Sequence, residues 1–265
     1  AEVRLQSRTL RFNRVHWVEA TGLQEHWQDS RIDARMISKD KIEVTTRNIR
    51  SFQLSPFADM SAVTISVDGT ELTAPADGTR ADPGTAILHK GTDGTFRWLG
   101  RGPTGDLVKR PGLQGPIDDA FLSSFLVVTP SGKSSNPLVE RWVQFELAHF
   151  LHRWESLYRG SPRVKQDSEV TQDDLARHNL VLWGTPESNS LFHRLAGEQG
   201  KPGSHPFPLK WSAKTVTLGT QKFSSDQHVP ILVYPNPLNP DRYVVINSGP
   251  THREGHDRTN SLQNP

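Results

Sequence analysis

The sequence predicts a protein of mixed α and β class: an N-terminal β-sandwich resembling a jelly roll, then a long amphipathic helix and a small α/β layered unit with a mainly parallel sheet. In residues 1–100, short runs alternate apolar and polar residues and end at turn residues, as in sandwiches and jelly rolls. One helical pattern covers 136–160. Apolar strand-like runs then alternate with short helical runs up to residue 249, which favours a parallel sheet.

In the first region, strands are predicted over 9–20, 31–38 and 41–49 from period-two alternation. For the first of them the inward residues are expected to be Leu10, Phe12, Val15, Trp17 and Ala20. The Asp-Gly pairs at 68–69 and 93–94 stand between strand-like runs, which predicts hairpins.

A linker is predicted over 101–118, where four Gly and three Pro occur. We therefore expect a sandwich domain at 1–116 and the helix with the α/β unit at 117–250. Whether the two domains share a strand is left open. The polar residues 251–265 predict a loose C-terminal tail.

The helix over 136–160 begins with Asn136 and Pro137, a favourable N-cap and first position, and Gly160 can end it. Its apolar residues recur at helical spacing, at 139, 142, 143, 147, 150, 151, 154 and 158. A second, short helix is predicted over 171–178, with Thr171 as cap and Asp174 at the capping-box position.

The α/β unit continues with a strand at 179–184 and a helix at 187–198. A strand or hairpin is predicted over 214–223. Further strands are expected at 229–236 and 242–249, joined by the proline-rich stretch 234–243 as a stiff crossing.

Composition excludes several classes of function. Cysteine is absent, which excludes disulfides, thiolate metal sites and a cysteine nucleophile. With 31 Lys and Arg against 29 Asp and Glu, the formal charge is +2, and like charges form no block. This argues against a nucleic-acid partner. The longest apolar run, 120–128, is too short to span a membrane.

Catalytic motifs are sparse. Serine hydrolases of the α/β type need a Gly-x-Ser-x-Gly elbow, and the sequence has none. Ser248, His252 and Asp257 could form a catalytic Ser/His/Asp set without that elbow. The favoured alternative is that Ser248 belongs to an ordinary loop of Ser, Gly and Pro.

Metal sites and cofactors are not expected. Two sets of residues resemble metal motifs in spacing, His252 with His256 and Glu146 with His149 and His152. Neither matches a zinc-protease or di-iron pattern, and ordinary polar faces explain both better.

Candidate ligand-binding residues lie in two turns. After the strand at 179–184, Gly184, Ser188 and Asn189 could present backbone N–H groups to an anion, although simple helix capping is favoured. In the stretch 234–243, Asn236 and Asn239 either mount a binding group or brace the chain.

Seven tryptophans raise the idea of a sugar-binding platform. Trp142 and Trp154 belong to the apolar stripe of the long helix, and Trp183 ends a strand. We expect these three in the core, which weakens that idea without removing it.

Four stretches together resemble a known family: 11–27, 109–128, 178–192 and 229–249. In order and spacing they are similar to the C-terminal region of large bacterial prolyl-oligopeptidase-like serine peptidases and esterases. In that family the α/β-hydrolase catalytic domain precedes the region matched here. The resemblance implies an accessory region, periplasmic or secreted, whose partner is that hydrolase domain. It supplies no triad residue for this chain.

Three hypotheses follow. The first is a non-catalytic accessory region that shapes a substrate site or binds polysaccharide or peptide substrate. The second is a stand-alone carbohydrate- or polymer-binding module that uses exposed aromatic side chains on the sandwich. The third is an independent serine hydrolase, an esterase or peptidase, that uses Ser248, His252 and Asp257.

Overall fold

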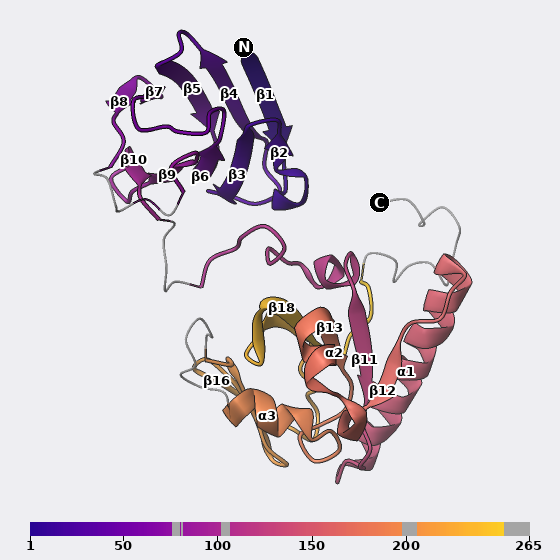
Figure 1. The fold of residues 1–265 in the computed structure, drawn as a ribbon. Coiled ribbons are helices and arrows are strands. Elements are labelled where there is room, and N and C mark those ends of the chain that lie inside the picture. The colour runs from indigo at the N-terminus through magenta and orange to yellow at the C-terminus, as the bar shows by residue number, and fades with distance from the viewer. Residues whose placement is uncertain (76–79, 81, 102–106, 198–205, 252–265) are drawn as a thin grey trace. The chain divides into compact units, whose positions relative to one another are not determined.

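The computed structural model describes residues 1–75, 80, 82–101, 107–197 and 206–251. The chain forms a mixed α/β protein that divides into two compact units, Ala1–Gln114 and Gly115–Pro265 (Figure 1). Each of the four sheets lies within one unit. The two units are described separately.

Unit 1 contains two five-stranded sheets. The order in the first sheet is β1 (Glu2–Ser7), β4 (Ser30–Met36), β5 (Lys41–Arg47), β7 (Thr64–Val67) and β8 (Thr70–Leu72). The order in the second is β10 (Phe96–Leu99), β9 (Ala86–Lys90), β6 (Ile49–Leu54), β3 (Val18–Leu23) and β2 (Arg14–Val15). Neighbouring strands are antiparallel except β5 and β7, which are parallel.

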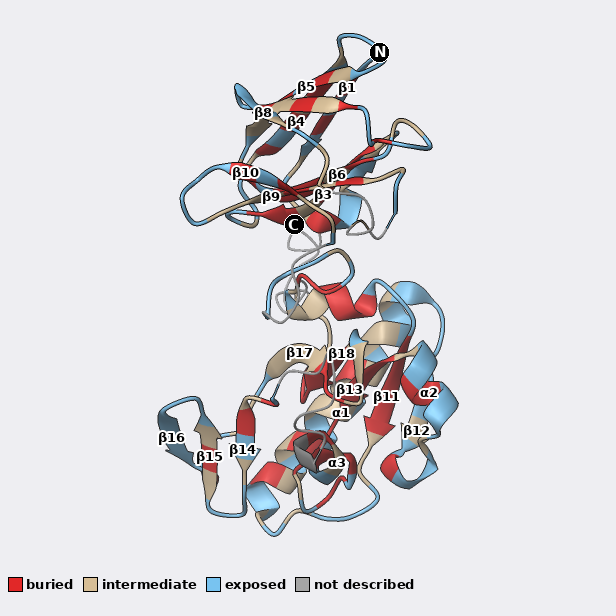
Figure 2. Ribbon diagram, turned by 60° about the vertical axis from the view of Figure 1, so that its left-hand side comes forward, coloured by how far each residue is buried: buried red, intermediate tan, exposed pale blue. Residues whose placement is uncertain are grey.

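One apolar core joins the two sheets of unit 1. Ile32 and Val44 of the first sheet belong to the same buried cluster as Phe52 and Leu88 of the second. Figure 2 shows buried segments in red that alternate with paler ones along the strands. The alternation follows from the period of two in a strand, which places successive side chains on opposite faces.

Hydrogen bonds and backbone conformations at turns explain the outcome of two predictions in unit 1, the Asp-Gly hairpins and the strand over 9–20. Asp68 and Gly69 join β7 to β8 with φ of 49° and 87°, as a two-residue hairpin turn requires, and the second Asp-Gly pair lies in the β9–β10 connection. The single strand expected over 9–20 is wrong. The Thr9 side chain accepts a hydrogen bond from the Arg11 N–H and starts a short 3₁₀ turn, which leaves Phe12 77% exposed.

Unit 2 is built on a five-stranded sheet. Its order is β12 (Val164–Gln166), β11 (Phe125–Thr129), β13 (Asn179–Leu182), β18 (Asn239–Ile246) and β17 (Leu232–Asn236). The first four strands are parallel and β17 is antiparallel to β18. A small antiparallel sheet contains β14 (Leu209–Trp211), β15 (Thr215–Leu218) and β16 (Gln221–Ser224).

The helices α1 (Pro137–Tyr158), α2 (Gln172–Arg177) and α3 (Leu191–Gly197) belong to this unit. The Asn136 side chain caps α1 by accepting hydrogen bonds from the N–H groups of Leu138 and Val139. Arg159, in the left-handed conformation at φ 58°, follows its last turn, one residue before the expected Gly160. Thr171 and Asp174 form the predicted capping box of α2.

The two faces of the larger sheet carry different partners. Leu126, Leu180 and Val244 join one buried cluster with Leu191 and Phe192 at the start of α3. The opposite face contacts α1, where Phe150 stacks on Trp183 and Trp154 meets Phe125 edge to face. Both sides of the central strands are therefore buried, as is usual for parallel strands.

The proline-rich stretch 234–243 is not a stiff crossing, as the sequence suggested, but the tight hairpin between β17 and β18. Asn236 pairs with Asn239 across the turn. The Asn236 side-chain oxygen accepts the Leu238 N–H at 2.9 Å, a local bond of the kind that lets asparagine close turns.

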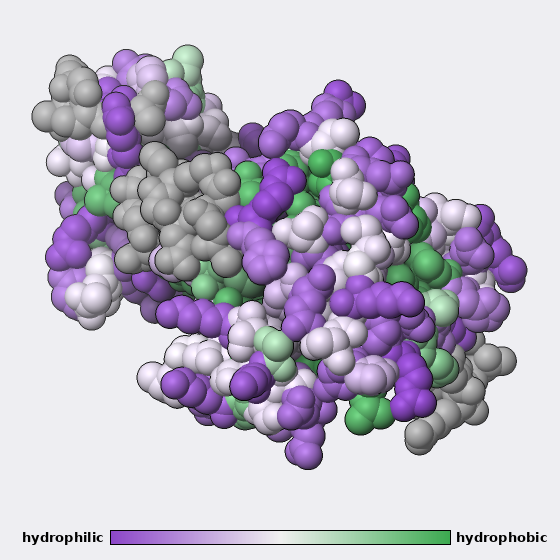
Figure 3. All heavy atoms as spheres, turned by 90° about the horizontal axis from the view of Figure 1, so that it is seen from below, coloured by the Kyte–Doolittle hydropathy of each residue, from purple (hydrophilic) through white to green (hydrophobic). Residues whose placement is uncertain are grey.

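No helix of the described residues is long and apolar enough to cross a membrane. On the face drawn in Figure 3, hydrophilic side chains predominate and hydrophobic ones gather in small groups. Scattered apolar groups of this kind are normal on protein surfaces.

Candidate functional site

A cavity of about 430 Å³ lies in unit 2 beside α1. Nine of its lining residues lie on α1, between Trp142 and Tyr158; the others are Trp183, Ile231 and residues 247–250. Trp183 directly follows β13 and Asn247 directly follows β18, so the cavity borders the carboxyl ends of two parallel strands. Open α/β sheets bind ligands at that edge, and the volume is that of a small-molecule site.

Aromatic rings form much of the cavity wall. Phe150 and Trp183 are stacked with their ring centroids 6.0 Å apart, and Trp154 and Tyr158 are tilted at 4.3 Å. Phe150 also meets Trp154 edge to face at 6.1 Å. Gly249 allows this packing, because a Cβ atom there would lie 2.7 Å from Cδ2 of Phe150. The aromatic rings are therefore packed closely, and the backbone at position 249 can approach Phe150 only because glycine has no side chain.

An acidic and two basic side chains of α1 also line the cavity: Glu146, His149 and Arg153. The Glu146 carboxylate lies 4.0 Å from Nδ1 of His149, and the Phe145 ring stacks on the imidazole. The cavity thus combines an apolar wall with a short row of charged and polar groups along one helix.

Ser248 lines the cavity, and its hydroxyl donates to the carbonyl of Gly249 at 2.8 Å. Its proposed partners His252 and Asp257 lie outside the described residues, as does most of the predicted tail. The Ser248, His252 and Asp257 set stays a prediction. At the end of the described chain, the Thr251 N–H and hydroxyl both donate to Asp118, at 2.6 Å.

The neighbouring turn holds Gly184, Ser188 and Asn189 through internal hydrogen bonds. The Gly184 N–H and carbonyl both bond to the Asn247 side chain, at 2.8 and 3.0 Å. The Ser188 hydroxyl accepts the Thr185 N–H at 2.8 Å. The Asn189 amide donates to the Trp183 carbonyl, and its oxygen accepts the Leu191 N–H.

These bonds give the three turn residues a structural role. Gly184 adopts φ 116°, and a Cβ atom there would lie 2.6 Å from the Ser188 hydroxyl, so only glycine fits. Asn189 is fully buried. An additional role in ligand binding stays a prediction for all three.

Carboxylate side chains accept hydrogen bonds from backbone N–H groups of the loop after β11. The N–H groups of Ser131, Ser134 and Ser135 donate to Asp167, Glu140 and Glu187, respectively. These carboxylates take the place that a bound anion would need at such a loop.

Asp167 connects this loop to the turn before α3, because it also accepts the N–H and the hydroxyl of Ser190, both at 2.6 Å. Burial alone would raise the pKa of Asp167, but the hydrogen bonds from Ser190 and Ser131 outweigh it and hold the pKa below its usual value. Hydrogen bonding to Ser135 likewise lowers the pKa of Glu187.

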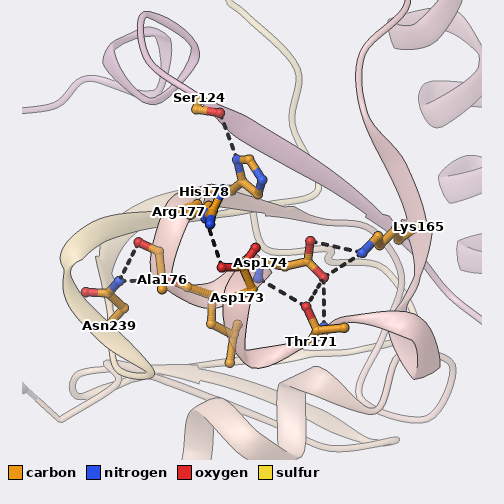
Figure 4. A network of polar contacts seen from close by, with 10 residues as sticks. Ser124, Lys165, Thr171, Asp173, Asp174, Ala176, Arg177, His178 and Asn239 are labelled. Atoms are coloured by element: carbon orange, nitrogen blue, oxygen red, sulfur yellow. Dashed lines mark hydrogen bonds and ion pairs between the residues drawn. The ribbon is translucent and has the colours of Figure 1, made fainter.

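The two asparagines of the β17–β18 hairpin differ in their surroundings. Asn236 is fully buried, and its amide nitrogen has no hydrogen-bond partner among the described residues. The Asn239 amide donates to the carbonyl of Leu175 in α2 at 2.9 Å (Figure 4). Both side chains brace the hairpin, and their proposed ligand role stays a prediction.

Figure 4 shows a polar network that the sequence did not predict as a whole. The Lys165 ammonium contacts both carboxylate oxygens of Asp174, at 3.0 and 2.7 Å, and Thr171 donates to the same carboxylate. Hydrogen bonding to Lys165 and Thr171 lowers the pKa of Asp174 from 3.8 to about 2. The capping box was visible in the sequence, but the contact of Lys165 in β12 with Asp174 in α2 was not predicted.

Ser124 and His178 lie at the other end of the strands from the cavity, directly before β11 and β13. The Ser124 oxygen is 2.7 Å from Nδ1 of His178. Burial, followed by the charge of Arg163, lowers the pKa of His178. Both residues stand at the amino ends of parallel strands, and Ser124 is exposed, so this pair does not belong to the cavity.

Within the described part of the chain, no group of three or more His, Asp or Glu side chains is placed to hold a metal ion. Comparisons with protein-family models, with curated proteins and with solved structures returned no match. The cavity beside α1 is therefore the feature on which a function can be proposed.

Proposed function

We propose that this chain is a non-catalytic accessory region of a secreted or periplasmic hydrolase-family protein, and that its cavity beside α1 holds part of a substrate. The observation that carries the proposal is the aromatic-walled cavity at the carboxyl edge of the sheet. A wall of this kind buries apolar ligand surface, and each buried CH₂ contributes about 0.8 kcal/mol.

The surroundings of Ser248 support a binding role over a catalytic one. A serine nucleophile needs a general base within hydrogen-bond reach. Among the described residues of the cavity wall, the Ser248 hydroxyl donates to the carbonyl of the next residue. The resemblance to peptidases and esterases supports an α/β-hydrolase domain as partner, with unit 1 as a β-sandwich of the jelly-roll type.

Catalysis is tested by incubating the chain with p-nitrophenyl esters and proline-containing peptides, next to the Ser248→Ala variant. We expect both proteins to leave the background rate of hydrolysis unchanged. Turnover by the wild type that Ser248→Ala abolishes would overturn the proposal and favour the serine hydrolase that uses Ser248, His252 and Asp257.

Binding is tested with the fluorescent probe 8-anilinonaphthalene-1-sulfonate, which reports apolar surface. We expect saturable emission that Ile231→Glu reduces, because Ile231 lines the cavity and is 53% exposed, so the substitution should not impair folding. The matched control is Ile37→Glu in unit 1, where the isoleucine is 46% exposed. Equal emission from both variants would contradict binding in the cavity.

A second candidate is a carbohydrate-binding module on unit 1. Trp27 is 49% exposed and adopts φ 72°, which is rare for a bulky residue and marks a surface site worth testing. Affinity electrophoresis through gels that contain soluble polysaccharides tests it. Retardation that Trp27→Ala removes would favour this function, and unchanged mobility in every gel would exclude it for those polymers.

A further inference from the structure

Four polar side chains of unit 2 stand at the amino edge of its larger sheet, away from the cavity. Ser124 directly precedes β11, and His178 directly precedes β13. The Asn179 N–H donates to the carbonyl of Ser124 at 2.9 Å, so the starts of these two strands lie side by side. Arg163 directly precedes β12, and Arg242 lies on β18.

The register of the parallel strands brings Arg242 beside His178. β13 and β18 pair Leu180 with Val244, and His178 and Arg242 stand two residues earlier on the two chains. Because side chains alternate between faces with a period of two, His178 and Arg242 project to the same face. Neighbouring strands are about 4.8 Å apart, so one small ligand can contact both side chains.

Two guanidinium groups act on His178, one from each side of it in the sheet. Burial lowers the pKa of the imidazole most, and the charges of Arg163 and Arg242 lower it further. The carboxylates of Asp174 and Asp173 act in the opposite direction. Arg163 stands on the β12 side and Arg242 on the β18 side, so the positive charges flank the imidazole.

The positive charge of these two guanidinium groups is not neutralised by the cluster. Within the part of the chain that the structure describes, neither guanidinium has a hydrogen bond or an ion pair. The neighbouring carboxylates already have cationic partners, Asp174 with Lys165 at 2.7 Å and Asp173 with Arg177 at 2.8 Å. An anion that enters the cluster therefore meets two available cations.

The Ser124 hydroxyl supplies a third donor. Its oxygen lies 2.7 Å from Nδ1 of His178 (Figure 4). When Nδ1 carries the proton, it donates to the serine oxygen, and the serine O–H is left to donate to an anion. The imidazole thus orients the hydroxyl, which is exposed at this edge of the sheet.

We propose that Ser124, Arg163, His178 and Arg242 form a binding site for a phosphate group, free or carried as a monoester. The guanidinium groups bind phosphate oxygens through charge-assisted hydrogen bonds, and the serine hydroxyl donates to a further oxygen. The site goes beyond the proposed function, because the cavity borders the carboxyl ends of the strands.

Binding is tested by adding sodium phosphate to the full chain and following the His178 imidazole by NMR, with the ionic strength held constant by sodium chloride. We expect a saturable shift. Arg163→Gln and Arg242→Gln should each weaken binding at least about tenfold, as the loss of a charge-assisted hydrogen bond predicts. Arg177→Gln is the matched control, because Arg177 is paired with Asp173 and exposed; its affinity should stay within about twofold of the wild type.

Phenyl phosphate and acetate identify the ligand. Saturable binding of inorganic phosphate alone supports the site with free phosphate as its ligand, and equal or tighter binding of phenyl phosphate supports it with a phosphate ester. Acetate that binds as tightly as phosphate overturns the inference. The absence of a saturable shift with both phosphate compounds also overturns it, as does equal affinity in the wild type and both arginine variants.

The pKa of His178 separates binding from a merely structural role of these residues. Bound phosphate should raise the pKa of His178, because its negative charge stabilises the imidazolium. Without phosphate, Arg163→Gln and Arg242→Gln should also raise this pKa, since each removes a positive charge that acts on the ring. An unchanged pKa at saturating phosphate overturns the binding site, and no rise in either variant overturns the placement of the arginines beside His178.

Discussion

Replacing Asp174 with asparagine removes a charge that four hydrogen bonds hold in place. Its carboxylate accepts two bonds from the Lys165 ammonium and two from Thr171, and the residue is 7% exposed. These partners lower the pKa of Asp174 from 3.8 to about 2. A difference of about 1.8 between the two pKa values corresponds to about 2 kcal/mol of stability at neutral pH.

The sign of the pH dependence follows from the lowered pKa. Because the folded state holds the carboxylate ionised to lower pH than the unfolded state does, the stabilisation is fully present above the unfolded value of 3.8 and disappears as pH falls toward 2. Asp174→Asn should therefore be about 2 kcal/mol less stable than the wild type at pH 7. The two proteins should converge near pH 2.

The assay is urea denaturation, with unfolding detected by hydrogen exchange. Peptides that cover β11 and β13 report the unfolding of unit 2 specifically. Asp173→Asn is the matched control, because Asp173 lies one residue earlier and pairs with Arg177 as a side chain that is 67% exposed. An exposed pair of this kind contributes at most about 0.5 kcal/mol. Equal losses in the two variants at pH 7, or a loss in Asp174→Asn that persists at pH 2, would refute this account of Asp174.

Three further predictions concern the cavity, its neighbouring turn and unit 1. Gly249→Ala should displace the Phe150 ring and cost about 1–3 kcal/mol, measured by urea denaturation, together with weaker binding of the anilinonaphthalene probe. Asn189→Ala should cost about 1–3 kcal/mol, because it leaves the Trp183 carbonyl buried without its donor; an unchanged midpoint would contradict this. Phe12→Ser should leave the thermal midpoint of unit 1 unchanged, since that side chain is exposed.

The features that the sequence predicted correctly depend on residues close together in the chain. The hairpin at Asp68–Gly69 and the capping box of Thr171 and Asp174 each involve groups two to four residues apart. Their chemistry is complete within the local stretch, so reading that stretch is enough. The Asn136 cap of α1 has the same character.

Two local predictions failed because a side chain competed with the regular pattern. The Thr9 hydroxyl bonds to the backbone and replaces the first part of the expected strand with a 3₁₀ turn. In the 234–243 stretch, three prolines suggested a rigid crossing, but the Asn236 oxygen closes a tight turn on the Leu238 N–H. Composition alone does not reveal which of these bonds forms.

The cavity could not be predicted from the sequence because its walls are far apart in the chain. Trp183 and residues 247–250 reach α1 only through the parallel pairing of β13 with β18. Helical spacing predicted Trp142 and Trp154 as core residues, whereas both line the cavity and are only half-buried. A helix stripe that borders a cavity has the same periodicity as one that is packed throughout.

The most direct test of binding beside α1 follows the indole N–H resonances of the seven tryptophans by NMR while the anilinonaphthalene probe is added. We predict saturable shifts for the three that line the cavity, Trp142, Trp154 and Trp183, and none for Trp17, Trp27, Trp98 and Trp211. Shifts confined to the second group, or no shift for any tryptophan, would contradict the account.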